Sequence, residues 1–158
     1  MAKRTEFDIG AAHKHFSVVC FNKAWELIEK SDRTEDEDEQ MIRLTISSHW
    51  HWTQREDYGP KNASIAYWQT SRVYSVLGLG DEARHYGQRC LEVSKNEEIP
   101  PFFLGYAYEA LARAEAVSAN QSKMDEYLNL MNQIVEKIKD SDEKKMLLDD
   151  MATIRSVG

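Results

Sequence analysis

Two pairs of side chains, one of an aromatic and a charged residue and one of two charged residues, have a spacing that could build a binding site. Trp68 and Arg72 are four residues apart, and so are Glu109 and Arg113. On a helix this spacing puts both members of a pair on one face. A guanidinium can then lie over the indole of Trp68, and Glu109 can form an ion pair with Arg113. We therefore expect these side chains to contribute to a ligand-binding surface.

A third group of the same kind precedes them, where His49 stands close to Trp50 and Trp52. Aromatic and arginine side chains are typical anchors of protein interfaces. An alternative is that the polar members only form salt bridges and stacks between neighbouring helices. The predicted binding residues are Trp68, Arg72, His49, Trp52, Glu109 and Arg113.

Histidines are the residues that could hold a metal ion, and the chain has five of them: His13, His15, His49, His51 and His85. The first four form two pairs whose members are two residues apart, so they point to different sides of a helix. Chelating pairs on helices are three or four apart, and a site needs three or four ligands. Glu82 and His85 form one Glu-x-x-His, whereas di-iron bundles use two. We assign no metal ligand and expect no cofactor.

Nucleophilic catalysis lacks a recognisable motif in this sequence. No serine or cysteine follows a strand-turn-helix elbow, and Gly78-Leu79-Gly80 lacks the Lys-Ser/Thr of a phosphate-binding loop. Active sites also assemble from distant residues, so an enzyme stays open, but no catalytic residue is assigned. Cys20 and Cys90 lie among apolar neighbours and are expected to be buried free thiols.

The elements that position these side chains are helices. Apolar residues recur at three- and four-residue steps, which predicts helical hairpins over residues 9–57, 62–95 and 100–139 and a final helix over 142–155. Thr34 and Glu37 form a capping box, and Gly78 can end a helix with a positive φ. Asn62, Asp81 and Asp142 are predicted N-caps.

One hairpin carries a known repeat pattern. A tetratricopeptide repeat (TPR) has large residues on its first helix, then a small residue, an aromatic and a glycine, with small residues on its second helix. The matching residues here are Tyr67, Ser71, Tyr74, Gly78, Ala83, Gly87, Cys90 and Leu91. Thr70 replaces the usual leucine, and Lys95 stands where a closing proline is common. The same frame, moved by 41 residues, meets Tyr108, Leu111, Ala112, Met124, Leu128 and Met131.

The second half of the chain therefore resembles a TPR protein. The helical pattern predicts an all-α fold with about seven helices in one domain over residues 1–158. The resemblance implies that they form a right-handed superhelical stack of about three antiparallel hairpins with a C-terminal capping helix. It also implies a concave surface lined by the first helices of the hairpins. We expect this surface to bind a protein or peptide without catalysis.

Two other functions remain open at this stage. One is a site for a small molecule or a metal ion, with or without catalysis. The first three helices would enclose it around His13, His49 and Arg72. The other is self-association as an isologous homodimer that buries one side of the stack.

Composition narrows the choice of partner. The formal net charge is −7 and the basic residues are scattered, whereas nucleic-acid-binding proteins present a clustered positive surface. No apolar run approaches the roughly 18 residues of a membrane span, and no apolar segment follows the charges of MAKRTEFD. We expect a soluble cytoplasmic protein that binds neither nucleic acid nor membrane.

Overall fold

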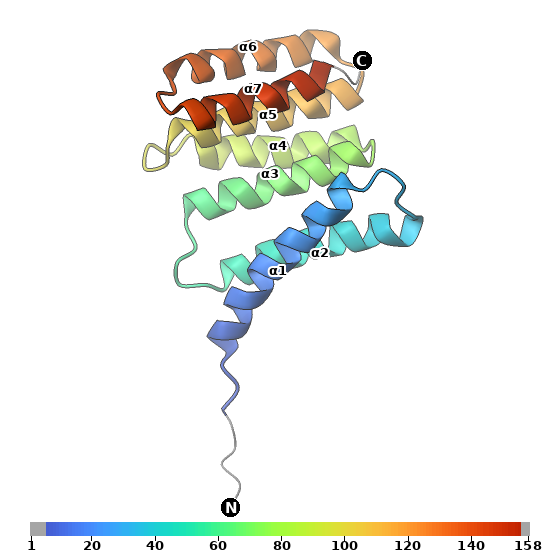
Figure 1. Cartoon of the computed structure of the whole chain (residues 1–158), viewed down its shortest axis with the longest axis vertical. Helices are drawn as coiled ribbons and strands as arrows, with labels where there is room; N and C mark the ends of the chain where they lie inside the picture. Colours follow the sequence, from blue (N-terminus) through green and yellow to red (C-terminus); the bar gives the residue numbers. More distant parts are fainter. Residues whose placement is uncertain (1–5, 156–158) are drawn as a thin grey trace, which may run out of the picture. The chain divides into compact units, whose positions relative to one another are not determined.

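The computed structural model describes residues 6–155 and contains seven α-helices and no strand in that range (Figure 1). The charged start of the chain, residues 1–5, and residues 156–158 lie outside it. The helices are α1 (Ile9–Glu29), α2 (Glu35–Thr53), α3 (Pro60–Val76), α4 (Gly80–Ser94), α5 (Pro101–Val117), α6 (Gln121–Lys137) and α7 (Ser141–Arg155). The predicted all-α class and helix number are confirmed. Within the described residues, none of the helices has the length and apolar character needed to span a bilayer.

Contacts divide the chain into two compact units, unit 1 up to Tyr58 and unit 2 from Gly59 onward. Unit 1 is the α1–α2 hairpin. Unit 2 holds the hairpins α3–α4 and α5–α6 followed by α7, so the hairpins expected over residues 62–95 and 100–139 and the final helix are all present. That the whole chain forms one domain stays a prediction.

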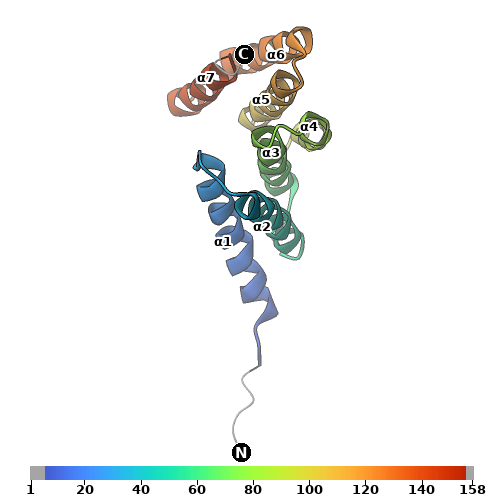
Figure 2. The ribbon, with the colours of Figure 1, turned by 90° about the vertical axis from the view of Figure 1, so that its right-hand side faces the viewer.

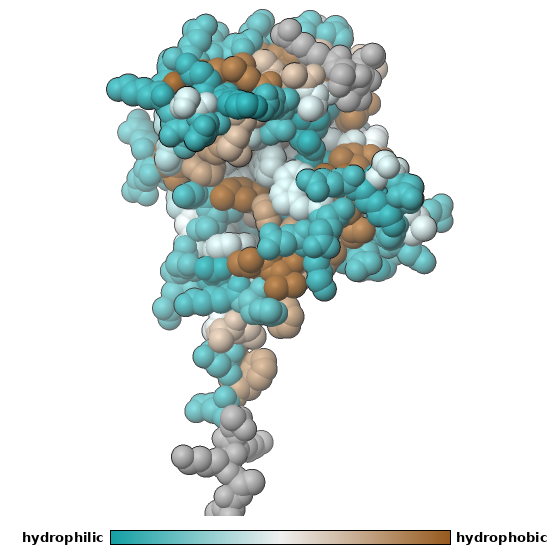
Figure 3. Space-filling model, in the orientation of Figure 1, coloured by the Kyte–Doolittle hydropathy of each residue, from teal (hydrophilic) through white to brown (hydrophobic). Residues whose placement is uncertain are grey.

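Polar residues form much of the helix contact in unit 1. Its fully buried side chains are Ser17, Ala24, Met41, Thr45 and Ser48. The Ser48 hydroxyl donates to the Ser17 carbonyl at 2.7 Å and ties α2 to α1. Large apolar side chains of α1, among them those of residues 16 and 18, are exposed, and Figure 3 shows hydrophobic atoms along this helix.

In unit 2 the second helix of each hairpin packs on first helices. Helix α4 contacts α3 and α5, α6 contacts α5, and α7 lies on α5 and α6 (Figure 2). Gly87 permits the close approach of α4 and α5, because a Cβ there would lie 3.0 Å from the Leu111 side chain. On the other side of α5, Leu128, Met131 and Leu147 join one apolar core. Helix α5 is therefore the central helix of unit 2.

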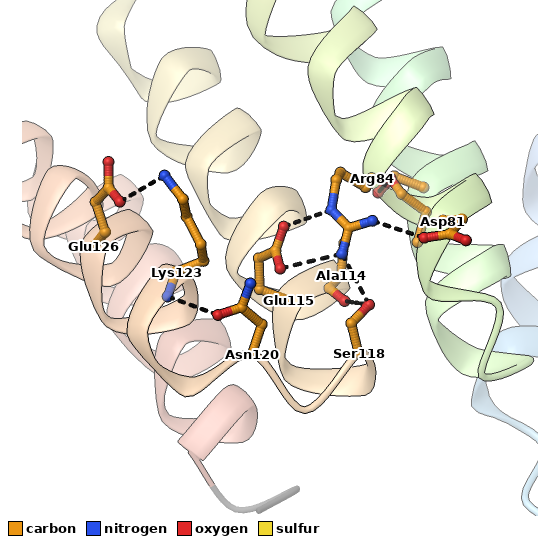
Figure 4. A network of polar contacts seen from close by, with 10 residues as sticks. Asp81, Arg84, Ala114, Glu115, Ser118, Asn120, Lys123 and Glu126 are labelled. Carbon is orange, nitrogen blue, oxygen red and sulfur yellow. Dashed lines mark hydrogen bonds and ion pairs between the residues drawn. The ribbon is translucent and has the colours of Figure 1, made fainter.

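An ion-pair network joins α4 to the end of α5 (Figure 4). Arg84 donates to both carboxylate oxygens of the buried Glu115, at 2.6 and 3.2 Å, and to the Ser118 hydroxyl at 3.1 Å. Asp81, predicted as the N-cap of α4, is instead in its first turn and accepts from Arg84 at 2.8 Å. The helix begins at Gly80 with Leu79 as its N-cap residue, so Asp81 lies two residues past the capping position.

Two further predicted N-caps are displaced. Helix α3 begins earlier, after Gly59, and the Asn62 side chain accepts from the Gly59 N–H at 3.1 Å. At α7 the Asp140 carboxylate accepts from the N–H groups of Asp142 and Glu143, so Asp140 takes the role expected of Asp142. Proline at the first position of α3 loses no hydrogen bond there, which allows the earlier start. The predicted capping box of Thr34 and Glu37 at α2 is confirmed.

The two cysteines differ in burial. Both are free, and Cys90 is fully buried beside Ser64 and Ser94. Burial raises the pKa of the Cys90 thiol to about 11. Cys20 is only half-buried. The expectation of burial is therefore right for Cys90 and wrong for Cys20.

The two hairpins of unit 2 repeat each other at a displacement of 41 residues. Helices α3 and α5 both begin with proline, at positions 60 and 101. Each hairpin stacks a tyrosine of its first helix on one of its second, Tyr67 on Tyr86 and Tyr108 on Tyr127, with ring centroids 6.4 Å apart in both. The turn between the helices uses a positive φ in both, 73° at Gly78 and 56° at Ala119.

The matched turns predict opposite effects of exchanging glycine and alanine. Ala119→Gly should raise the free energy of unfolding by about 0.5–1 kcal/mol, because it removes left-handed strain. Gly78→Ala should lower it by about 1 kcal/mol. An added Cβ at Gly78 meets nothing within 4 Å, so the cost is in the backbone alone. Urea denaturation of both variants measures the pair, and effects of the same sign would contradict the analysis.

Candidate functional site

Four of the six predicted binding residues come together in unit 2. Trp68 and Arg72 lie on α3, and Glu109 and Arg113 lie on α5. The other two, His49 and Trp52, lie on α2 in unit 1 and have different neighbours.

The Glu109 carboxylate is the centre of the group in unit 2. It is fully buried. Its Oε2 accepts from Trp68 Nε1 at 2.8 Å, and its Oε1 accepts from Arg72 at 2.9 Å and from Arg113 Nε at 2.7 Å. Charged hydrogen bonds of this kind offset the cost of removing a carboxylate from water. The four side chains therefore hold α3 against α5.

Three more hydrogen bonds carry this network to α7. Arg113 donates to the Asp150 carbonyl at 3.2 Å and to the Thr153 hydroxyl at 2.8 Å. The Tyr106 hydroxyl donates to the Asp150 carboxylate at 2.7 Å. Helix α7 is thus attached to α5 through polar contacts as well as through the apolar core.

Burial changes the titration of two groups in the network. It lowers the pKa of Arg72, an effect that the facing Glu109 carboxylate opposes. Burial, and then the hydrogen bond to Asp150, raise the pKa of Tyr106 well above its usual range. Tyr106 therefore stays a neutral hydrogen-bond donor, and its ring is held in place by that bond.

An apolar pocket of about 270 Å³ opens beside the network, between α3 and α5. Its lining residues are Ser64, Ile65, Trp68, Phe102, Phe103 and Tyr106. The Trp68 and Tyr106 rings meet edge to face, with centroids 5.2 Å apart. Since their polar atoms are bonded to Glu109 and Asp150, these two rings present hydrocarbon to the pocket.

Sequence reasoning named Trp68 but missed the rest of the lining. Phe103 and Tyr106 were not among the predicted binding residues, and both are only half-buried. A signal was present in the repeat, because Ile65 and Tyr106 are 41 residues apart and occupy the same position of successive hairpins. Equivalent positions of neighbouring first helices lie side by side, so they can line one pocket.

The two predicted residues in unit 1 have partners within that unit. His49 forms a hydrogen bond with the Tyr58 hydroxyl at 2.9 Å. The Arg55 guanidinium lies over the Trp52 ring, 3.6 Å from its centroid, and binds Asp57. These contacts hold the C-terminal end of α2 and the segment that follows it together.

A histidine pair joins α1 and α2 in unit 1. Nδ1 of His13 and Nδ1 of His51 are 2.8 Å apart, so one ring donates and the other accepts. Trp50 packs edge to face on both rings. Burial, and then the charge of His13, lower the pKa of His51. Within the residues that the structure describes, no three histidine, cysteine or acidic side chains gather as metal ligands.

No protein-family model, no curated protein and no solved structure matches the chain. The resemblance of residues 67–91 to a TPR stays a prediction.

The Glu109 network predicts a large difference between two glutamate variants. Glu109→Gln leaves the buried guanidinium of Arg113 and the half-buried one of Arg72 facing a neutral amide, which should lower the free energy of unfolding by about 3 kcal/mol. Glu126→Gln removes an exposed ion pair with Lys123 and should cost less than about 0.5 kcal/mol. Chemical denaturation compares the two, and equal costs would show that the buried network adds little.

The histidine pair predicts a pH dependence in the acid range. The pKa of His51 is below its ordinary value of 6.5, so below that pH the unfolded chain binds more protons at this site than the folded chain. The contribution of His51 to the free energy of unfolding is complete above its pKa in the unfolded chain. It is lost as the pH falls toward its lower pKa in the folded chain.

Thermal unfolding should therefore show a Tm that decreases as the pH is lowered from 7.5 to 5. The decrease should be smaller in His51→Gln than in the wild type. His85→Gln changes an exposed histidine of α4 and should leave the wild-type profile. A profile of His51→Gln as steep as that of the wild type would contradict this assignment.

Proposed function

We propose that the protein is a non-enzymatic scaffold, built from TPR-like helical hairpins, that binds a protein or peptide on the face formed by α3 and α5. The observation that carries the proposal is the pocket between these helices, whose walls are Ile65 and four aromatic rings. Aromatic residues in a partly open apolar site are typical of the anchor positions of interfaces.

The size of the pocket favours a side chain over a cofactor. A cavity of about 150 Å³ holds benzene, and sites for drug-sized ligands span about 300–1,000 Å³. The pocket, at about 270 Å³, lies between these values. It suits one large side chain of a partner whose remaining contacts lie outside.

The network behind the pocket supports binding with little loss of freedom. Glu109 fixes the Trp68 ring and Asp150 fixes the Tyr106 ring by hydrogen bonds. A wall already held in one position loses little side-chain entropy when a partner enters. Glu109 and Arg113 thus support the site from behind and need not touch the partner.

The location we propose is the cytoplasm. Its support is that Cys20 and Cys90 are both free thiols, as is usual for proteins of reducing compartments.

A selection of peptides from a random phage-displayed library tests the proposal. Wild-type protein should enrich peptides that share an apolar residue, and Ile65→Trp, which fills the pocket from its own lining, should enrich none of them. Affinity of a selected peptide should fall at least tenfold in that variant.

Leu79→Trp is the matched control, because it places the same indole at an exposed apolar position away from the pocket. It should bind the selected peptides as the wild type does. Equal binding by Ile65→Trp, or no enrichment by the wild type, would contradict the proposed function.

A further inference from the structure

We infer that the pocket between α3 and α5 takes a side chain without polar groups, that of Phe, Leu or Met, from a peptide segment that carries a carboxylate next to it. This inference rests on the proposed binding function and names the class of partner.

The pocket offers no hydrogen-bonding side chain to what enters it. Trp68 Nε1 donates to Glu109, and the Tyr106 hydroxyl donates to Asp150. The hydroxyl of Ser64, the remaining polar side chain of the lining, is buried and bonded to Ser94 Oγ at 2.7 Å.

A polar atom brought into such a pocket loses its water and gains no partner. Leaving a buried donor or acceptor unpaired costs about 1–3 kcal/mol, which corresponds to roughly 5- to 150-fold in affinity. Tyr and Trp carry such an atom at the end of the ring, whereas Phe, Leu and Met do not. The lining therefore selects by chemistry among side chains of similar size.

A cation lies at the edge of the pocket. The Lys61 ammonium lies over the ring of Phe103, 5.5 Å from its centroid, and its side chain is exposed. Over residues 6–155, Lys61 forms no salt bridge. A carboxylate on the residue next to the anchor could approach this ammonium while the anchor occupies the pocket.

The preference for a peptide with acidic residues has to arise at Lys61 itself. The chain as a whole has a net charge of −7, so it does not attract acidic peptides in general. Complementary charges at the edge of an interface mainly give specificity. One reversed charge should therefore reverse the preference.

The test is an NMR titration of ¹⁵N-labelled full-length protein with the peptide Gly-Glu-Phe-Glu-Gly, capped at both ends. We expect shifts at the Trp68 indole and at backbone amides of residues 61–68 and 102–106. Replacing the Phe of the peptide with Leu or Met should retain binding, and Tyr should weaken it at least fivefold. Ala should weaken it at least tenfold.

Charge is tested with the peptide Gly-Lys-Phe-Lys-Gly and two protein variants. Lys61→Glu should bind the acidic peptide about three- to tenfold less tightly and the basic peptide more tightly than the wild type does. Lys137→Glu makes the same change in net charge on α6 and should leave both affinities unchanged. Equal affinities for the Phe and Tyr peptides, no effect of Lys61→Glu, or shifts outside the pocket would overturn the inference.

Its failure can be told apart from failure of the proposed function. If the library yields pocket-dependent peptides with polar anchors or basic neighbours, the scaffold function stands and this partner class is wrong. If no peptide depends on the pocket, both are wrong.

Discussion

A buried carboxylate is the constraint on which unit 2 depends. Glu109 has no access to water, so its charge must be balanced by donors from the protein, and these are Trp68 and Arg72 of α3 and Arg113 of its own helix. Each donor restricts how α3 can lie on α5. Removing a donor would leave charge unpaired in the interior, so the arrangement of α3 on α5 depends on all three donors.

The register of the first helices repeats along unit 2. Arg72 donates to Glu109, 37 residues ahead, and Arg113 donates to the carbonyl of Asp150, also 37 residues ahead. Helix α7 thus lies against α5 in the same register as α5 lies against α3. Because the register repeats, α7 packs on the last hairpin and also positions Tyr106 at the pocket through Asp150.

Trp68 and Tyr106 belong to both the network and the pocket, and the two ends of each side chain have different surroundings. The nitrogen of Trp68 and the hydroxyl of Tyr106 are directed to carboxylates, and their rings line the apolar space. An amphipathic aromatic side chain suits this position because it needs one polar partner and offers a large apolar face. A site for an apolar anchor therefore arises beside a buried salt bridge without any polar atom facing the ligand.

Spacing along the chain was enough to determine the helices, the ion pair of Glu109 with Arg113 and the 41-residue repeat, because these depend on residues within one or two turns or on a simple displacement. Only the tertiary structure decided that Glu109 also receives Trp68 and Arg72, that His49 and Trp52 belong to another unit, and that Phe103 and Tyr106 line a pocket. These outcomes depend on which faces of α3 and α5 meet. Helical periodicity identifies an apolar face but does not say which helix will cover it.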